Sequence, residues 1–205
     1  MRITALFIIA ILNLSILTHA SANSPDAAKQ YLNSISDSAF DFLQSDSKSL
    51  TERAKDLKKL ILNEVNMNDV APFLLGRYQR KATPEQLQEF SDLVVDYMVL
   101  SYVKQLAQYS AKQFEITDAI GQNDAFIVTT LITPNGDASP FKIQWMVKTN
   151  NDGEFKIIDI LVGGLSMVVT QRDEFVSVIK RKKGDISKFL ALLEKKVKSN
   201  AKKLK

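Results

Sequence analysis

The sequence predicts an α+β fold in which an antiparallel sheet of four strands packs against helices from both ends of the chain. Three observations predict it. Apolar residues recur at helical spacing from residue 25 to about residue 110, the period then changes to the two-residue alternation of strands, and helical spacing returns after Gly163-Gly164. Helices, then strands joined by short turns, then closing helices are typical of a single α+β domain.

The first two predicted helices span residues 25–45 and roughly 48–65. Ser24-Pro25 provides a capping residue followed by a proline in the first turn, where proline is well tolerated. The apolar positions of the first helix share one side: Ala28, Tyr31, Leu32, Ile35, Ala39, Phe42 and Leu43. Those of the second helix lie opposite its lysines: Leu50, Ala54, Leu57, Leu60, Ile61 and Val65. Both helices are therefore expected to pack one face against a core.

A short apolar helix, DVAPFLLGRY, follows. We expect Asn68 or Asp69 to cap its start and Gly76 to end it. The run from Thr83 to Gln86 then combines a capping residue, a first-turn proline and a glutamine, which is the pattern of a capping box. The helix that it opens is predicted to reach about Ser110. Its apolar residues cover more than a narrow stripe, so it is expected to be the most buried helix.

Four segments have the composition and alternation of strands: KQFEITDAI, DAFIVTTLIT, FKIQWMVKT and EFKIIDILV. The turn residues between them are Gly121, Pro134-Asn135-Gly136-Asp137 and Asn151-Asp152-Gly153. Short turns between successive strands predict an antiparallel meander. After the glycine pair, helices are predicted from about Leu165 to Arg181 and from Asp185 to Lys198.

The first 22 residues, MRITALFIIAILNLSILTHASA, have the layout of a secretory signal peptide. They contain Arg2, an apolar stretch that ends at Leu17, and a small-x-small sequence at Ala20-Ser21-Ala22. A signal anchor is the competing interpretation, but the apolar stretch is shorter than the roughly 20 residues that span a bilayer. We expect cleavage after Ala22 and a soluble mature protein outside the cytoplasm.

Cleavage at this point would leave a chain with neither histidine nor cysteine, because His19 is the only histidine and the sequence has no cysteine. Imidazole bases, thiolate nucleophiles and the usual zinc ligand sets need one or the other. The composition therefore excludes most hydrolase mechanisms and every disulfide. We expect a signal peptide over 1–22, a single domain over 23–198, and a basic, disordered tail over 199–205.

Charge is distributed unevenly along the chain. Residues 180–205 contain eleven Lys or Arg and two acids, whereas residues 23–179 contain fifteen and twenty-one. A basic end of this kind can contact anionic lipid headgroups or an acidic partner. A solvated helix end is the alternative interpretation. The acidic body makes nucleic acid a poor candidate partner.

Two residues are candidates for chemistry. Ser166 follows a strand and Gly164, as in half of a nucleophile elbow, but the second glycine and the activating histidine are missing. Ser166 is better explained as the N-cap of the following helix. Asp159 interrupts an apolar strand, and beside a cavity it could act as a general base with Tyr97 as its acid partner. Alternatively, Asp159 pairs with a basic residue or accepts backbone N–H bonds.

Apolar residues also crowd around the two glycines and in the short helix. A packed core is the ordinary explanation. The alternative is that helices and a curved sheet enclose an apolar cavity for a lipid tail, with its mouth near the glycines.

Three stretches bear on this choice: VAPFLLGRYQRKATPEQLQEF, TPNGDASPFKIQWMVKT and DILVGGLSMVVTQRDEFVSVIKRKKGDISKFLALLEKK. Together they resemble the MlaC, or toluene-tolerance, family of periplasmic phospholipid carriers, and the similarity covers nearly all of the chain after residue 22. The resemblance implies a curved antiparallel sheet packed against helices, related to the nuclear-transport-factor-two-like fold, with a cavity for acyl chains. Gly163 departs from the acidic residue expected before the glycine, so a partner or headgroup contact made there is in question.

On this resemblance the chain is expected to be a periplasmic phospholipid carrier without catalytic activity, cofactor or metal. The implied partners are phospholipid, an outer-membrane lipoprotein–porin complex and the lipid-binding subunit of an inner-membrane ATP-binding-cassette (ABC) transporter, with transient membrane-surface contact. The implied role is to maintain outer-membrane lipid asymmetry. Three alternatives remain open: a carrier of hopanoid or another polycyclic lipid, a ligand-free adaptor docking through the basic C-terminal helix, and an enzyme using Asp159 and Tyr97.

The predicted cavity lining is drawn from the short helix, the long helix, the last two strands and the segment after the glycines. Its members are Val70, Phe73, Leu74, Tyr78, Phe90, Val94, Tyr97, Met98, Trp145, Val147, Ile160, Val162, Leu165, Met167 and Val168.

Overall fold

The structure, a computed structural model, describes residues 23–44, 48–107, 111–135 and 139–204. The predicted signal peptide with His19 lies outside the described residues, as do Gly136, Asp137 and the predicted helix end at Ser110. The side chains of three apolar residues predicted for the first helix also lie outside the part of the chain that the structure describes: Ala39, Phe42 and Leu43.

Within these ranges, and in chain order, a first group of helices is followed by the strands of a sheet and then by two closing helices. The helices before the sheet are α1 (Pro25–Gln44), α2 (Leu50–Glu64), α3 (Met67–Leu75), the 3₁₀-helix η1 (Gly76–Lys81) and α4 (Pro84–Ala107). The strands are β1 (Ala111–Gln122), β2 (Ala125–Pro134), β3 (Phe141–Thr149), β4 (Phe155–Val162) and β5 (Leu165–Ser166). The closing helices are α5 (Met167–Arg181) and α6 (Ile186–Lys202). The predicted α+β class is confirmed.

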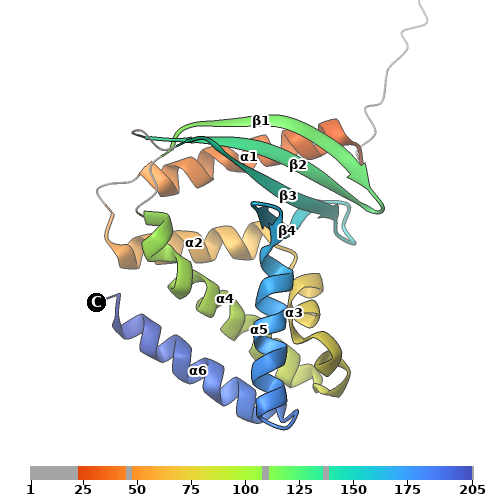
Figure 1. Cartoon of the computed structure of the whole chain (residues 1–205), viewed down its shortest axis with the longest axis vertical. Coiled ribbons are helices and arrows are strands. Elements are labelled where there is room, and N and C mark those ends of the chain that lie inside the picture. The colour runs from red at the N-terminus through yellow and green to blue at the C-terminus, as the bar shows by residue number, and fades with distance from the viewer. Residues whose placement is uncertain (1–22, 45–47, 108–110, 136–138, 205) are drawn as a thin grey trace, which may run out of the picture.

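The sheet is a curved meander in which every strand pairs with its neighbours in the sequence, in the order β1-β2-β3-β4-β5 and always antiparallel (Figure 1). The described sheet has five strands where four were predicted. The fifth strand, β5, has only two residues, which is too short for an alternating pattern to be recognised.

A two-glycine turn joins β4 to β5. Val162 pairs with Leu165, and between them Gly163 and Gly164 have φ values of 58° and 80°. Tight two-residue hairpins favour positive φ at both central positions, and glycine adopts it without the strain that a Cβ brings. The glycine pair therefore turns the chain back on itself.

Helix caps account for most of the helix boundaries. The Thr83 hydroxyl accepts from the Gln86 N–H at 3.2 Å and the Gln86 side chain accepts from the Thr83 N–H at 3.0 Å, so the predicted capping box is confirmed. The predicted start of the short helix was wrong. Asn66 is the cap, because its side chain accepts from the N–H of Asp69 while the preceding Val65 forms a bridge with Ile157 of β4. Gly76 ends α3, as predicted.

The last helix is longer than predicted. Asp185 caps α6, its side chain accepting from the N–H of Lys188 at 3.0 Å. The helix continues to Lys202, past the predicted end at Lys198. Residues 199–202, predicted to belong to a disordered tail, are therefore helical.

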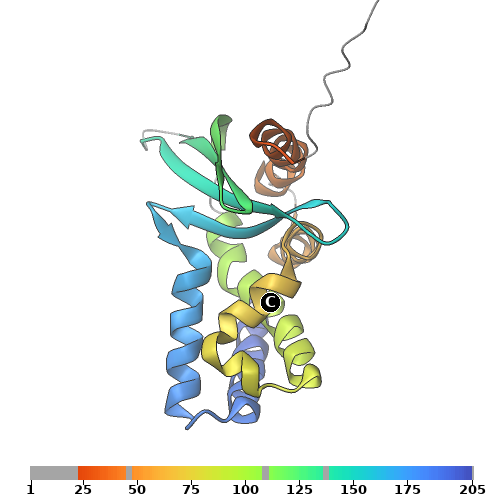
Figure 2. The same ribbon diagram turned by 90° about the vertical axis from the view of Figure 1, so that its right-hand side faces the viewer.

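The sheet lies at one end of the molecule with α1 beside it, and most of the other helices lie toward the opposite end (Figures 1 and 2). Helix α1 runs along the sheet, and the remaining helices extend away from it (Figures 1 and 2). The Tyr31 hydroxyl of α1 donates to the Glu64 carboxylate at 3.0 Å, which ties α1 to the end of α2. Burial, together with the nearby Glu64 carboxylate, raises the pKa of Tyr31.

Three groups of buried side chains form the core. The sheet cluster lies between α1 and the sheet and contains Ala28, Leu32, Phe126, Val128, Val147 and Ile157. The helical cluster joins α3 to α6 through Val70, Ala71, Leu74, Leu75, Tyr78, Phe90, Val94, Phe175, Ile179, Ile186, Phe189, Leu190 and Leu193. A third group packs α2 against α4 through Leu57, Val95, Val99 and Val103. As predicted, α4 is central, since it supplies buried residues to two groups.

Replacing Gly76 with alanine is expected to lower the free energy of unfolding by about 2–3 kcal/mol, because a positive φ that L residues rarely adopt costs about 1–3 kcal/mol and a steric clash adds to it. Gly76 has φ 56° and ψ −133°. An added Cβ would lie 2.9 Å from Cγ2 of Val176 in α5. Urea unfolding measures the change. Gly121→Ala is the matched control, since the nearest atom to its added Cβ is 3.8 Å away. Equal effects of the two substitutions would contradict the expectation.

Candidate functional site

The junction between the sheet and α5 is held by a carboxylate. Oδ1 of Asp159 accepts from the backbone N–H of Ile160 at 2.7 Å and of Val168 at 3.1 Å, and Oδ2 accepts from the Ser166 hydroxyl. The Ser166 hydroxyl in turn accepts from the N–H of Val169 at 2.9 Å. The first N–H groups of a helix have no partner within the helix, so these bonds complete the start of α5. The carboxylate also lies at the positive end of the helix dipole.

These contacts decide between the interpretations of the two candidate residues. Ser166 is the N-cap of α5, as predicted. Asp159 accepts hydrogen bonds from backbone N–H groups, which was one of the two structural roles considered for it. Tyr97, its candidate acid partner, packs against Phe175 with ring centroids 5.6 Å apart. The carboxylate therefore has a structural role that accounts for an acidic residue in this apolar strand.

Strand β4 contributes to two core groups and contains a β-bulge. Met146 pairs with Asp159 and Val147 with Ile157, so Ile158 is the extra residue on β4. Ile157 is buried in the sheet cluster, whereas Ile158 packs against the helical cluster. Alternation alone puts these two neighbours on opposite faces, and the bulge then brings Ile160 rather than Asp159 onto the face of Ile157, against the sheet cluster. Strand β4 is therefore where the two clusters meet.

The structure divides the predicted lining among three environments. Eight residues belong to or pack against the helical cluster: Val70, Leu74, Tyr78, Phe90, Val94, Tyr97, Met98 and Val168. Three belong to or pack against the sheet cluster: Trp145, Val147 and Ile160. Three are exposed: Phe73, Val162 and Leu165. Met167 is half-buried at the start of α5.

Aromatic side chains fill the space between α4, α5 and α6. The Phe175 ring of α5 lies 5.7 Å from that of Phe90 and 5.4 Å from that of Phe189, both measured between centroids. Tyr97 contacts the same ring from the next turns of α4. Phe175 is therefore the side chain through which three helices contact one another.

The indole N–H of Trp145, on the apolar side of the sheet, has a hydrogen-bond acceptor. Nε1 of Trp145 donates to the Thr130 hydroxyl at 3.0 Å, and that hydroxyl donates to the Ile143 carbonyl at 3.2 Å. Thr130 is fully buried. These bonds orient the Trp145 ring on β3 without leaving a buried polar group unpaired.

Apolar side chains are exposed where β5 leads into α5. Leu165 is 67% exposed, Val162 39% and Val169 37%. The Arg172 guanidinium lies 5.0 Å from the centroid of the exposed Phe73 ring, a cation–π contact between α5 and α3. We call Val162, Leu165, Val169 and Phe73 the apolar rim. Apolar residues gathered on a surface often mark a site of contact with other molecules.

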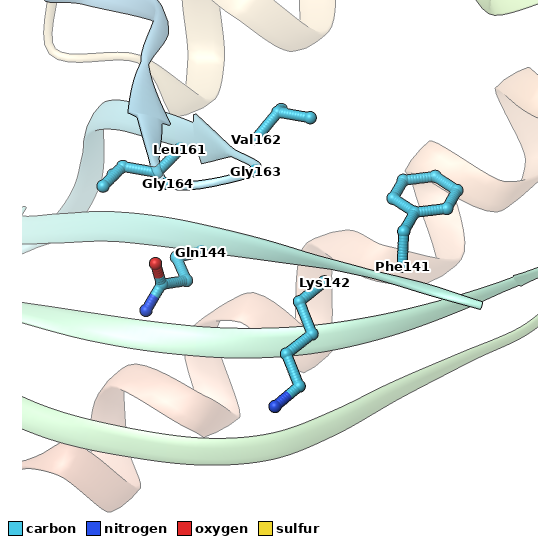
Figure 3. Close-up of a pocket in the computed structure, with 7 residues that line it drawn as sticks. All are labelled: Phe141, Lys142, Gln144, Leu161, Val162, Gly163 and Gly164. Atoms are coloured by element: carbon cyan, nitrogen blue, oxygen red, sulfur yellow. The ribbon is translucent and has the colours of Figure 1, made fainter. Parts of the chain in front are cut away.

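A depression of about 610 Å³ adjoins the two-glycine turn. Its lining residues are Phe141, Lys142, Gln144, Leu161, Val162, Gly163 and Gly164 (Figure 3). The side chains of Phe141 and Val162 lie on one side of β3, and those of Lys142 and Gln144 lie on the other. Only Val162 was among the predicted site residues. The proximity of Gly163-Gly164 was a signal for the others, but the pairing of β3 with β4 was needed to identify them.

A second, polar depression of about 630 Å³ lies along α5, lined by Thr170, Asp173, Glu174, Ser177, Val178 and Arg181. Burial, and then the charges of Tyr97 and Glu174, raise the pKa of Tyr102 on the neighbouring helix α4.

In the described ranges, no group of three or more acidic, histidine or cysteine side chains is placed to hold a metal ion. None of the described helices combines the length and the apolar character needed to span a bilayer.

Comparison with known proteins places this geometry in context. Residues 33–195 match the family model described as MlaC protein. The chain is 24% identical over 112 residues to the toluene tolerance protein ttg2D of Pseudomonas putida, covering 55% of this chain and 52% of that protein. The match thus spans about half the length of the Pseudomonas protein. The chain is 22% identical over 153 residues to the intermembrane phospholipid transport system binding protein MlaC of Haemophilus influenzae, with 71% of each covered.

The fold is also similar to a solved structure, the phospholipid-binding protein from Ralstonia solanacearum in complex with a phospholipid. The TM-score is 0.72 at 18% identity, and the superposition covers 85% of this chain and 98% of that one. The two chains therefore share their fold.

Proposed function

The chain belongs to the MlaC family, and from this premise we propose that it is a phospholipid-binding transport protein that holds lipid acyl chains between its sheet and its helices. One observation supports the proposal most strongly. The protein from Ralstonia solanacearum, which shares this fold over 85% of the chain, was solved with a phospholipid. The apolar interior and the apolar rim supply the surface that such a ligand needs.

The physical requirement for an acyl-chain site is a large apolar surface. Burying a lipid chain is worth about 0.8 kcal/mol per methylene relative to water, so two chains amount to well over 10 kcal/mol. A bilayer removes the acyl chains from water equally well, so a carrier gains no free energy over the membrane. The carrier shields the lipid while it crosses water, and its partners determine the direction of transfer. The structure provides apolar side chains on both sides of β4, in the sheet cluster and the helical cluster.

We place the acyl chains where these clusters meet, between β4 and helices α4 and α5. The half-buried residues of the predicted lining come from both clusters and from the start of α5: Tyr97, Met98 and Val168 pack against the helical cluster, Trp145 and Ile160 pack against the sheet cluster, and Met167 begins α5. An aromatic side chain can change rotamer without breaking backbone hydrogen bonds, so the half-buried Tyr97 can move aside for a chain. The apolar rim then lies at the entrance, beside the two-glycine turn.

The family and the sequence support the finer parts of this proposal. Residues 1–22 act as a signal peptide and the protein works in the periplasm. The residues after it form one lipid-carrier domain. It exchanges phospholipid with an outer-membrane lipoprotein–porin complex and with the lipid-binding subunit of an inner-membrane ABC transporter, and so maintains outer-membrane lipid asymmetry. It performs no catalysis, because the Asp159 carboxylate is occupied by backbone N–H groups and the Ser166 hydroxyl, and Ser166 is the N-cap of α5.

Mass spectrometry of the protein purified without detergent tests the proposal. We expect the native protein to carry a stoichiometric phospholipid that denaturation and extraction release, because the acyl chains are held by apolar contacts alone. The extracted lipid also identifies the ligand class, since a hopanoid would have a distinct mass. A protein that is reproducibly empty, even after incubation with phospholipid vesicles, would contradict the proposal.

A tryptophan at position 168 sharpens this test. Val168 is half-buried between the sheet and the helical cluster, so Val168→Trp should lower lipid content while thermal unfolding shows a folded protein. Leu62→Trp is the matched control, because Leu62 is 54% exposed on α2. Should Val168→Trp prevent folding, Ile160→Trp places the same bulk at the sheet side of the site. Unchanged lipid content in the folded variants would show that the site lies elsewhere.

A further inference from the structure

The outward face of α6 is strongly basic. Residues 186–204 contain six lysines and one glutamate. The buried side chains of α6 are Ile186, Phe189, Leu190 and Leu193. On the opposite side, a row with helical spacing is exposed: Lys188, Leu192, Lys195, Ser199 and Lys202. We call this row the basic face. Three further exposed lysines flank it: Lys196, Lys198 and Lys203.

The position of α6 makes the basic face point away from the rest of the molecule. Helix α6 lies at the end of the molecule away from the sheet, and α4 lies between them (Figures 1 and 2). Since the buried side of α6 packs on α4, through contacts such as that of Phe189 with Phe90, the basic face points outward from this end. Residues 23–179 contain fifteen basic and twenty-one acidic residues, so the rest of the molecule has the opposite charge. A charge distribution of this kind orients a protein in an electric field.

Few carboxylates compensate the lysines. Glu194 pairs with Lys198 at 2.6 Å and Asp185 with Lys188 at 2.9 Å. Both lysines remain largely exposed, with side-chain exposures of 68% and 71%. Exposed pairs of this kind contribute little and are readily exchanged for other anions.

The chemistry of the face fits an anionic lipid surface better than a shaped protein site. From Lys188 to Lys202 the row extends about 21 Å at 1.5 Å per residue. It contains lysines and no arginine. Lysine is a flexible, hydrated point charge, suited to mobile phosphate groups, whereas arginine suits fixed bidentate partners. Leu192 is 42% exposed in the middle of the row, where it can enter the headgroup layer.

We propose that the basic face of α6 docks the protein reversibly on the surface of a bilayer that contains anionic phospholipid, independently of any lipid held inside. The apolar side of α6 is committed to the helical cluster, so contact is electrostatic with one leucine inserted. Such contact decays within a screening length of about 8 Å at physiological salt. None of the four residues of the apolar rim belongs to α6, so docking leaves the rim free for other contacts.

Vesicle sedimentation with the full mature chain tests this proposal. The probes are vesicles of phosphatidylglycerol mixed with phosphatidylethanolamine and vesicles of phosphatidylcholine alone. We expect binding to the first and not to the second. We also expect release when salt rises from about 0.1 M to about 1 M, since the screening length falls from about 10 Å to about 3 Å.

Substitutions of lysine residues test whether the basic face is responsible for the binding. Each lysine near an anionic surface strengthens binding about fivefold, so Lys188→Gln, Lys195→Gln and Lys202→Gln together should weaken it about 100-fold. The three corresponding Lys→Arg substitutions keep the charge and should keep the binding. The matched control replaces three exposed lysines just before and within α2, Lys48, Lys55 and Lys59, with glutamine and should bind as the unaltered protein does.

Three outcomes would overturn the proposal: equal binding to neutral vesicles, equal losses in the control and basic-face variants, and no binding to anionic vesicles at low salt. The last would assign the lysines to an acidic protein partner. Mass spectrometry of bound lipid on the same variants separates this proposal from the proposed function, because neutralising the basic face should leave the internal lipid unchanged.

Discussion

Replacing Phe175 with alanine is expected to lower the free energy of unfolding by about 3–5 kcal/mol, because the substitution removes a buried ring and leaves a cavity. Phe175 is 4% exposed and its ring contacts those of Phe90, Tyr97 and Phe189. Domains of this size are stable by only about 5–15 kcal/mol, so the loss is a large part of the total. Urea unfolding followed by circular dichroism measures it.

Phe73→Ala is the matched control for this substitution. The Phe73 ring is 42% exposed and contacts the Arg172 guanidinium. An exposed cation–π contact is worth about 0.5–1 kcal/mol, so the control should lose about 1 kcal/mol or less. If Phe175→Ala were no more destabilising than Phe73→Ala, the three helices would have to be held together by other contacts.

Asp159→Ala is expected to lower the free energy of unfolding by about 3 kcal/mol, since hydrogen bonds to a charged acceptor contribute about 1.5–3 kcal/mol each and do not add fully. The carboxylate accepts from Ile160, Ser166 and Val168, so its loss leaves the start of α5 without its main acceptor. Asp159→Asn keeps one acceptor oxygen and the side-chain shape, and its loss should be smaller, about 1 kcal/mol.

Thermal and urea unfolding of these two variants give the ranking, with Asp152→Ala as the control. Asp152 is exposed in the turn before β4, and surface substitutions of this kind usually change stability by less than about 0.5 kcal/mol. A variant of Asp159 as stable as the control would contradict the structural role. It would restore interest in the alternative that Asp159 and Tyr97 form an acid–base pair.

Most of the secondary structure could be predicted because local signals decide it. The capping box of Thr83 and Gln86, the cap at Ser166 and the helix end at Gly76 are all formed within a few residues. The cap of α3 was misplaced because Asn66 is positioned by a strand far along the chain: the Asn66 N–H donates to the Ile157 carbonyl at 2.9 Å. No pattern near Asn66 encodes that contact.

The candidate site was harder to predict for a related reason. An apolar residue that lines a ligand site and one that fills a core have the same composition. Val147 and Val94 are both fully buried, yet one lies in the sheet cluster and the other in the helical cluster. The bulge at Ile158 decides which side of β4 faces which cluster, and Ile157-Ile158 gives no sign of it in the sequence. Conversely, Lys142 and Gln144 were overlooked because polar residues on a strand usually face solvent.

The meander has a consequence for the order in which the chain can fold. Every strand pairs with a sequence neighbour, so each hairpin closes a short loop, and contacts that are local in sequence favour fast folding. The docking of α6 on α4 is different. The hydrogen bond from Gln86 to Ser187 joins residues 101 positions apart, and the intervening chain contains the whole sheet. Closing a loop of that length costs more chain entropy than closing any of the hairpins. The sheet can therefore form before α6 arrives, and the step that completes the helical layer is the one that needs the C-terminal end of the chain.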